Sequence, residues 1–586
     1  MHIEARAIAR VPLSLLTRLR LVLFGHEDLA GIIFWAALVG ICGALASVAF
    51  REGIRLLELI FTGQASGLVN GASQLVGWHR ALVPPVGGAL AGWVLYLLGS
   101  RFISLKVTDY MEASLVGDGR ISLRGTLLRS ASSLLTIASG GSIGREGSMV
   151  QLSAMIGSRL GLLARAPVPR LRLMVACGSA AGIAAAYNAP ISGALFVSEI
   201  VLGSLAMDTF GPLVVASVMS DATIHRFLGY GPVFNVPHVQ FVSNWELGFY
   251  IVLGVLLGHL APAFLALLDF SKGRFVRLGL PLYWQLALGG LIVGVISIFT
   301  PQVWGNGYSV IGNILQGDLV GWFLLAVLFA KVAATSATAG SGAVGGVLTP
   351  TLFIGCAVGS LVGGVLHDLM PKIVSVPAAY ALIGMGGFLS ATTLAPLTCI
   401  LLLFEMTGDY DLVLPLMLAC VTAHYTAKVY RKGKSVYYAS LHNAVSGEGA
   451  DDWRLRTVET LVKPATAVVS DTLTLAEVFD QLPKRPLERV FVVKGEELVS
   501  WMSPREVLEK LHHSELDGAL PVTAVAKPVE FALMPDMPLT TALEAFLREQ
   551  TTILPVTPGQ WRNTLLGEVA RNDVMLAIQD RLTYPK

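Results

Sequence analysis

Charged residues are scarce in this sequence. Asp, Glu, Lys and Arg make up 14% of the 586 residues, whereas hydrophobic residues make up 54%, and the mean hydropathy is +0.66. A soluble globular protein carries about 25% charged residues, so the composition excludes a wholly soluble protein. The formal net charge is only +2, which argues against a nucleic-acid partner.

The sequence also lacks a signal-peptide pattern. Its first long apolar run, residues 31–50, contains 20 uncharged residues and is long enough for a membrane-spanning helix. Residues 1–29 carry arginines among leucines and valines, which predicts an amphipathic segment on the cytoplasmic surface. The basic run at residues 431–434 closes the apolar region, and the positive-inside rule then places both chain ends in the cytoplasm. We therefore expect a multi-pass protein of the cell (inner or plasma) membrane.

Cysteine is rare as well, and its positions do not have metal-ligand spacing. All five lie in apolar segments and are expected to be small buried residues: Cys42, Cys177, Cys356, Cys399 and Cys420. No nucleophile–base pair or phosphate-binding loop stands out in the sequence. We expect neither a bound metal nor enzymatic activity.

Uninterrupted apolar spans of 20 residues are a minority, because Gly and Pro break many segments. Broken helices are stable at membrane depth only where their backbone is buried in protein or lines a cavity. Glycine-rich breaks at 140–147 and 340–346 are each followed by an Ala-Pro pair, and a glutamate follows each proline by nine residues: Pro190 and Glu199, then Pro396 and Glu405. This repeated order predicts a helical membrane domain at 30–440 with duplicated halves, at about 30–230 and 245–440.

The C-terminal part of the chain has a different character. After a polar linker at 441–454, residues 455–586 alternate short β-rich runs with helical patterns, which is typical of a soluble α/β domain. Residues 498–507 are similar to residues 565–574 at an offset of 67. The tail is therefore predicted to be doubled, with modules at about 455–515 and 520–586.

One acid stands in an unfavourable place. Glu146 lies in the run Ser-Ile-Gly-Arg-Glu-Gly-Ser at residues 142–148, between two apolar segments. A charged group at that depth costs roughly 2.5–3.5 kcal/mol, so we expect it to face a cavity or an ion path. The run resembles the G-(K/R)-E-G-P signature of the CLC family of chloride channels and transporters, with Ser148 in place of proline. The resemblance implies an inverted-repeat fold and a gating role for Glu146, whereas a structural acid paired with Arg145 is the alternative.

A permeating anion needs weak donors, and backbone N–H groups at helix N-termini supply partial positive charge without trapping it. The first candidate helix start includes Gly144, Arg145 and Gly147. The second, residues 346–350, resembles the family's G-x-F-x-P motif, and by analogy the amides of Val347 and Leu348 contact the central anion. Thr349 is predicted to be the N-cap of that helix, with Pro350 at its first position. Residues 433–438 resemble the family's G-K-P-L-Y run, which implies that the Tyr437 hydroxyl also reaches the anion.

The chain departs from the family in two places. The family's G-S-G-I-P run, whose serine faces the central anion, has no counterpart here: one register places Lys106 at the serine and another places Thr108 there. Antiporters of the family often carry an inner acid in an F-x-x-E-E run, where this chain has Ile200, with Glu199 one residue earlier. Isoleucine cannot relay a proton, and adjacent helical residues point about 100° apart. The sequence therefore favours passive conduction, with Glu199 as a candidate for a proton path and Glu405 as a structural acid.

The tail resembles a tandem pair of CBS modules. Such pairs often bind adenine nucleotides through an aspartate in a T-x-x-D run, and residues 570–573 keep the acid but lose the hydroxyl. Asp573 is therefore the candidate nucleotide contact. A purely structural or dimer-stabilising tail without a cofactor is the favoured expectation.

Together these features predict a homodimer in the lipid bilayer, with one chloride path per subunit gated by Glu146 and conducting passively. A chloride/proton antiporter of the same fold is the first alternative. A fluoride exporter is another, because Ser148 replaces the proline. A CBS nucleotide sensor, for which the membrane part is only an anchor, is the alternative from a different class.

Overall fold

The computed structural model describes residues 29–100, 109–115, 117–203, 205–229, 233–234, 243, 245–431, 457–482, 487, 489–512, 516–529, 531–549, 551–559 and 564–579. The chain divides into two compact units, Met1–Leu441 and His442–Lys586. Each unit is described on its own.

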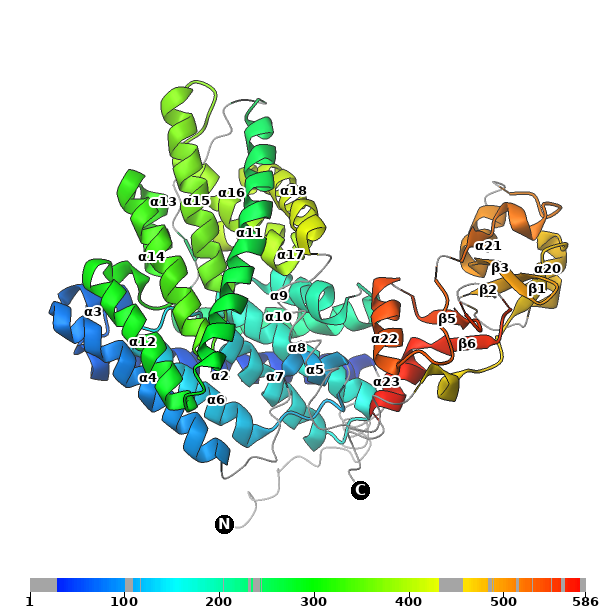
Figure 1. Ribbon diagram of the computed structural model, residues 1–586, viewed down its shortest axis with the longest axis horizontal. Coiled ribbons are helices and arrows are strands. Elements are labelled where there is room, and N and C mark those ends of the chain that lie inside the picture. Colours follow the sequence, from blue (N-terminus) through cyan, green and yellow to red (C-terminus); the bar gives the residue numbers. More distant parts are fainter. Residues whose placement is uncertain are drawn as a thin grey trace, which may run out of the picture. The chain divides into compact units, whose positions relative to one another are not determined.

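The first unit is helical and consists of two halves that follow one another in the chain (Figure 1). The first half contains α2 (Leu29–Thr62), α3 (Leu68–Gln74), α4 (Gly77–Ser100), α5 (Tyr110–Leu115), α6 (Leu123–Ala138), α7 (Glu146–Leu163), α8 (Val168–Tyr187), α9 (Pro190–Phe196), the π-helical η1 (Val197–Leu202) and α10 (Met207–Leu228). The second contains α11 (Glu246–Arg277), α12 (Leu282–Phe299), the 3₁₀ turn η2 (Pro301–Val303), α13 (Tyr308–Gln316), α14 (Gly321–Gly340), α15 (Leu348–Leu369), α16 (Pro377–Thr393), α17 (Pro396–Thr407), the 3₁₀ turn η3 (Tyr410–Leu412) and α18 (Val413–Arg431).

Helix lengths in this unit are uneven, as the interrupted apolar segments predict. Within the described part of the chain, seven helices are long and apolar enough to cross a membrane, whereas α9 and α17 are shorter apolar helices. Corresponding helices of the two halves end with the same backbone conformation. The residues after α8 and α16, Asn188 and Leu394, are both left-handed, and an Ala-Pro pair then starts α9 and α17.

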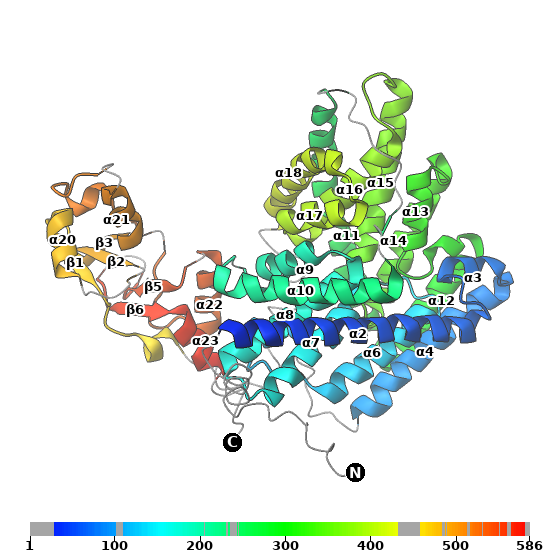
Figure 2. The same cartoon turned by 180° about the vertical axis from the view of Figure 1, so that it is seen from behind.

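The helices pack closely in pairs. Helix α4 lies against α12, α7 against α8, and α15 against α16, as the two opposite views show (Figures 1 and 2). Glycines permit the first contact, because a Cβ at Gly88 would lie 2.4 Å from the Leu286 carbonyl oxygen and one at Gly290 would lie 2.3 Å from that of Pro84. Such close backbone approach is typical of helices packed within a membrane. All five cysteines are unpaired, and every one except Cys42 is fully buried.

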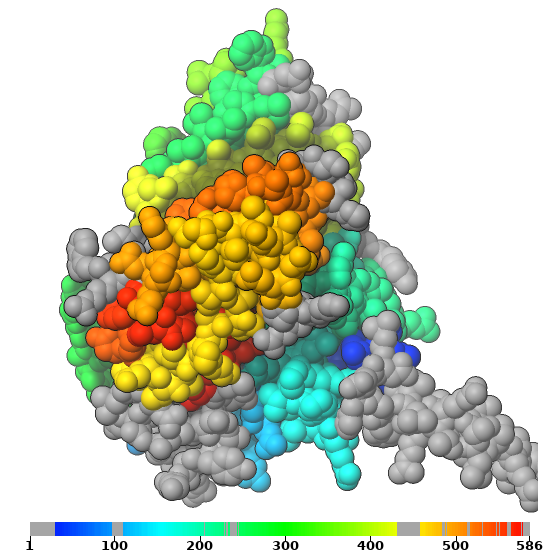
Figure 3. Space-filling view, turned by 90° about the vertical axis from the view of Figure 1, so that its right-hand side faces the viewer, coloured from blue at the N-terminus to red at the C-terminus, as the bar shows by residue number. Residues whose placement is uncertain are grey.

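The second unit is α/β (yellow to red in Figure 3). One helix–strand–strand–helix set consists of α20 (Leu475–Gln481), β2 (Val490–Lys494), β3 (Glu497–Met502) and α21 (Pro504–His512), and the next of α22 (Leu539–Arg548), β5 (Ile553–Val556), β6 (Gly567–Ala570) and α23 (Arg571–Gln579). The strands β1 (Val468–Ser470) and β4 (Lys527–Pro528) complete a sheet of order β1-β2-β3-β4, parallel only between β1 and β2, while β5 pairs antiparallel with β6. The remaining 3₁₀ turns are η4 (Val458–Leu461) and η5 (Val522–Ala524). The order helix–strand–strand–helix thus occurs twice in the described part of this unit.

Candidate functional site

The two glycine-rich breaks meet in space. The Gly144 N–H donates to the Gly346 carbonyl at 2.7 Å, and the Gly346 N–H donates back to the Gly144 carbonyl at 2.8 Å. This reciprocal pairing is what a local two-fold relation between the duplicated halves produces. It brings together the starts of α7 and α15, whose first-turn N–H groups have no partner within their own helices.

Glu146 is the first residue of α7 and is fully buried. Its Oε1 accepts a hydrogen bond from the Thr349 hydroxyl on α15, and the Asn306 side chain lies beside the carboxylate. Among the described residues, Oε2 has no hydrogen-bond partner within standard geometry. The carboxylate folds back over Gly144, where a Cβ would lie only 2.0 Å from Oε2. The break therefore needs glycine at this position.

Thr349 does not cap its own helix. Helix α15 begins at Leu348 with Val347 as its N-cap, so Thr349 and Pro350 lie inside the first turn. The predicted N-cap at Thr349 is therefore wrong by two residues. Instead of accepting a bond from a first-turn N–H as an N-cap does, the Thr349 side chain points to the other half, where its hydroxyl donates to Glu146.

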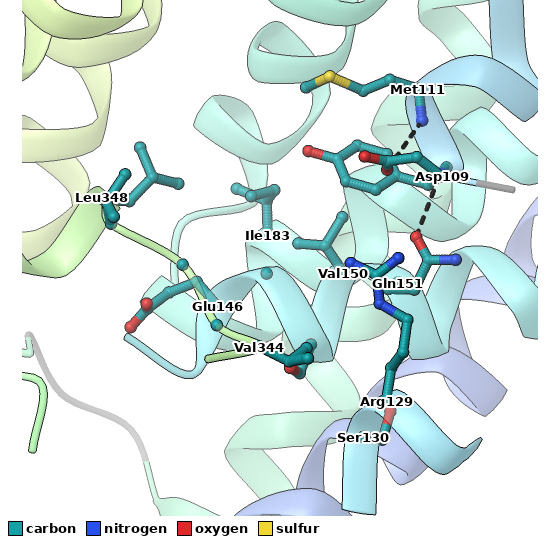
Figure 4. A pocket seen from close by; sticks show the side chains of 16 residues that line it. Asp109, Met111, Arg129, Ser130, Glu146, Val150, Gln151, Ile183, Val344 and Leu348 are labelled. Carbon is teal, nitrogen blue, oxygen red and sulfur yellow. Dashed lines mark hydrogen bonds between the residues drawn. The ribbon is translucent and has the colours of Figure 1, made fainter. Parts of the chain in front are cut away.

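A cavity of about 260 Å³ adjoins the two helix starts. Helix α7 contributes Glu146, Gly147 and Ser148, and the second break contributes residues 344–348, including Val347 and Leu348. The opposite wall contains polar and charged side chains, namely Asp109, Arg129 and Gln151, from which the Glu146 carboxylate points away (Figure 4). The cavity thus joins first-turn amides of both halves with one buried carboxylate at its edge.

Arg145 and Ser148 flank Glu146 but turn to other partners. The Arg145 guanidinium lies over the Tyr308 ring, 5.6 Å from its centroid, and no salt bridge within 4.0 Å joins it to Glu146 in the described part of the chain. The Ser148 hydroxyl donates to the Ser133 hydroxyl on α6 at 2.8 Å. The geometry does not favour a carboxylate held by Arg145.

The two acids of the nine-residue repeat cap each other's helices. The Glu199 carboxylate accepts from the Thr398 N–H at 2.8 Å and hydroxyl at 2.6 Å, and from the Leu397 N–H at 3.3 Å, at the start of α17. Glu405 accepts the corresponding bonds at the start of α9, from the Ile191 N–H and from the N–H and hydroxyl of Ser192. Both carboxylates therefore stabilise helix N-termini.

Three of the sequence-predicted site residues, Lys106, Thr108 and Tyr437, lie outside the described residues. Asp573, the candidate nucleotide contact, lies in the first turn of α23 and forms a salt bridge with Lys463 at 2.9 Å. Sequence reasoning missed Asn306 and Tyr308 as neighbours of the run at residues 142–148. Neither carries a local signal, because both reach the site from the other half, Asn306 from the loop before α13 and Tyr308 from the first position of that helix.

The comparisons with known proteins agree with this geometry. The sequence profile of the family described as voltage-gated chloride channel matches residues 87–428. A putative chloride channel protein ClcB-like from Ralstonia nicotianae is 53% identical over 397 residues, covering 67% of this chain and 92% of the relative. The voltage-gated ClC-type chloride channel ClcB of Citrobacter koseri is 40% identical over 410 residues, covering 69% of this chain and 97% of its own.

Solved structures with the same fold are also similar. A slow cyanobacterial Cl⁻/H⁺ antiporter has a TM-score of 0.63 at 25% identity and covers 71% of this chain and 98% of its own. A CLC-type fluoride/proton antiporter, at 21% identity and a TM-score of 0.57, covers 69% of this chain and 96% of its own and shares the fold. The chain therefore belongs to the family of voltage-gated chloride channels, the CLC family.

Proposed function

We propose that this protein conducts chloride passively through the membrane unit and that Glu146 is the gate. The observation that supports this most directly is a fully buried carboxylate at the meeting point of two helix N-termini, with one oxygen unpartnered among the described residues. An ionised carboxylate there occupies the donors that a passing anion needs. When protonated, it loses its charge, its attraction to the helix N-termini weakens, and the side chain can leave.

The surroundings of Ile200 support passive conduction over proton exchange. Glu199, the nearest acid in the sequence, is engaged by the start of α17. Between Ile200 and Leu348 lies an apolar cavity of only about 10 Å³, which is room for about one water molecule. This region of the described chain therefore offers neither a side chain nor a chain of water molecules that would carry a proton from Ile200 to Glu146.

Exchange of chloride for protons is the second candidate, and the similarity to the cyanobacterial Cl⁻/H⁺ antiporter favours it. The two functions differ in flux through liposomes that contain the purified protein under a chloride gradient. We expect chloride to move without driving protons uphill. Proton uptake against the proton gradient would establish exchange instead.

The same assay with fluoride tests the third alternative, which Ser148 leaves open: fluoride efflux much faster than chloride efflux would favour a fluoride exporter.

We further propose that the chain is a homodimer in the inner or plasma membrane with both termini cytoplasmic. Helices α9, α10, α17 and α18 present exposed apolar side chains that need lipid or a partner, among them Ile191, Val218, Leu397, Leu414, Met417 and Val421.

We assign the tail as a CBS pair with a structural role. A nucleotide at Asp573 would have to compete with Lys463. Binding of adenine nucleotides to the purified chain, measured by calorimetry, tests that assignment.

A further inference from the structure

A lysine is buried inside the membrane unit without a carboxylate partner. Lys331 lies in α14 and is fully buried. Its ammonium group donates to the carbonyl oxygens of Val303 at 2.9 Å and Gly305 at 2.7 Å, and it lies 5.8 Å from the centroid of the Phe353 ring. No acidic side chain of the described residues lies within 4.0 Å of it. A buried cation of this kind is strongly unfavourable unless its protons are bonded, so Lys331 and the segment at 301–307 hold each other in place.

The same segment is fixed from its other side by the first glycine break. Trp304 is fully buried and lies against Gly140, where a Cβ would lie 2.4 Å from the indole ring. Gly305 and Gly307 have φ values of 66° and 98°, so the segment turns sharply and ends at the start of α13. The segment at 301–307 is therefore held between α14 on one side and the first glycine break, which precedes Glu146, on the other.

The far end of the segment forms one wall of the gate. The Asn306 side chain lies beside the Glu146 carboxylate. The Tyr308 ring receives the Arg145 guanidinium and lies near Thr349, the donor to Glu146. A continuous series of contacts thus runs from the Lys331 ammonium, through the carbonyl groups of Val303 and Gly305, to the side chains that surround the Glu146 carboxylate.

The duplication gives this lysine a counterpart. Lys331 lies 17 residues before Leu348, the first residue of α15, and Arg129 lies 17 residues before Glu146, the first residue of α7. The helices that carry them share further positions at the same offset: Ser139 donates to the Thr136 carbonyl, and Ser341 donates to the Thr338 carbonyl. Arg129 lines the cavity, whereas Lys331 supports the loop. The two basic residues therefore occupy corresponding places with different tasks.

We propose that Lys331 is a positioning residue of the Glu146 gate: by binding the 303 and 305 carbonyls, it holds Asn306 and Tyr308 against the closed carboxylate. This inference rests on the proposed gating role of Glu146. Without the lysine, the segment at 301–307 becomes more mobile and holds Asn306 and Tyr308 less firmly against the Glu146 carboxylate. The blocking position of the carboxylate is then less stable, and the path opens more often at neutral pH.

The test measures chloride flux from liposomes at neutral and acidic pH. It compares the effect of Lys331→Met in the otherwise unaltered protein with its effect in the Glu146→Ala variant. We expect Lys331→Met to raise flux at neutral pH about fivefold, the equivalent of one hydrogen bond of about 1 kcal/mol, and to flatten the pH profile. In the Glu146→Ala background the same substitution should change nothing further. An equal change in both backgrounds would overturn the positioning role alone. If Glu146→Ala itself leaves flux and its pH profile unchanged, the proposed gate fails, and the Lys331 role fails with it.

A second variant covers the case in which Lys331→Met does not fold. Asn306→Ala removes the loop side chain beside the carboxylate and should reproduce the rise in flux and the flattened pH profile. A flux profile identical to that of the unaltered protein would overturn the proposal. The matched control is Ser271→Ala, which removes another side-chain hydrogen bond to α14, at the Ser336 carbonyl, away from the loop. It should leave the pH profile unchanged.

Discussion

At the scale of single residues, the proposed gate makes chloride flux depend on the charge of Glu146. Glutamine has nearly the same shape as glutamate but no charge, so Glu146→Gln imitates the protonated gate at every pH. We expect chloride flux at neutral pH to rise about tenfold, the effect of about 1.4 kcal/mol, and to lose its pH dependence. Liposome flux across a pH series measures both.

The matched control for this prediction is a second buried acid at a helix start. Glu246 is fully buried at the beginning of α11, where its Oε1 accepts from the Ser375 N–H at 2.7 Å. Glu246→Gln should leave the pH profile of flux in place. If both variants changed the profile equally, the effect would come from buried carboxylates in general and not from the gate.

Gly144 leaves the space that the Glu146 carboxylate occupies. A Cβ there would lie 2.0 Å from Glu146 Oε2 and 2.9 Å from the Gly346 carbonyl oxygen, and that backbone cannot move aside cheaply. We expect Gly144→Ala to destabilise the membrane unit by about 1–3 kcal/mol and to weaken the pH dependence of flux. Gly364→Ala in α15 adds the same atom where no neighbour lies within 4 Å, and should neither lower the melting temperature nor change the flux. Equal effects of the two substitutions would contradict the close approach at Gly144.

The sequence indicates some of these residues and not others, for a physical reason. A buried acid and closely spaced glycines are visible locally, so Glu146 and both breaks could be singled out. The donor to Glu146, Thr349, lies 203 residues away and was misassigned as a cap, because its local pattern is that of an N-terminus. Asn306 carries no local signal, since it meets Glu146 only when the two halves pack together. Lys331 is the only charged residue of the apolar segment 321–340 and is visible as such, but its partners at Val303 and Gly305 are not.

At the scale of elements, the reciprocal caps link α9 and α17. Each carboxylate accepts two backbone N–H groups and one hydroxyl, so Glu199→Ala and Glu405→Ala should each destabilise the protein by about 1–2 kcal/mol. Thermal melting of the purified protein measures this, and flux assays on the same samples should show chloride conduction retained. If Glu199→Ala altered proton movement without lowering the melting temperature, Glu199 would act as a proton carrier and not as a cap.

The elements also show what the nine-residue spacing could predict. The spacing from proline to glutamate identified Glu199 and Glu405 as equivalent, and their caps are equivalent in the structure. The π-helix at Val197–Leu202 was not predicted, although it changes the register around Glu199 and Ile200. A π-helical turn is rare and occurs mostly as a single-turn interruption of an α-helix, so the apolar pattern of this segment predicts an ordinary helix.

At the scale of the whole molecule, composition separates the two units clearly. Apolar segments broken by Gly and Pro predicted the helical membrane unit, and short β-rich runs predicted the α/β tail. Both predictions hold, since they depend on burial within each unit. The duplication of the membrane unit was also visible, because matching helix starts must keep glycine where the two breaks meet.

The tail is expected to be dispensable for conduction. Two chloride-channel relatives align over only 67% and 69% of this chain, although 92% and 97% of their own length is covered, so about a third of this chain has no counterpart in them. A chain that ends at Leu441 should therefore conduct chloride at a rate similar to that of the full-length protein and keep the pH dependence that the proposed gate predicts. Flux through liposomes containing equal amounts of each protein measures this, and size-exclusion chromatography checks that the shortened chain is folded. A folded, shortened chain without flux would show instead that the C-terminal unit helps to form or hold open the path.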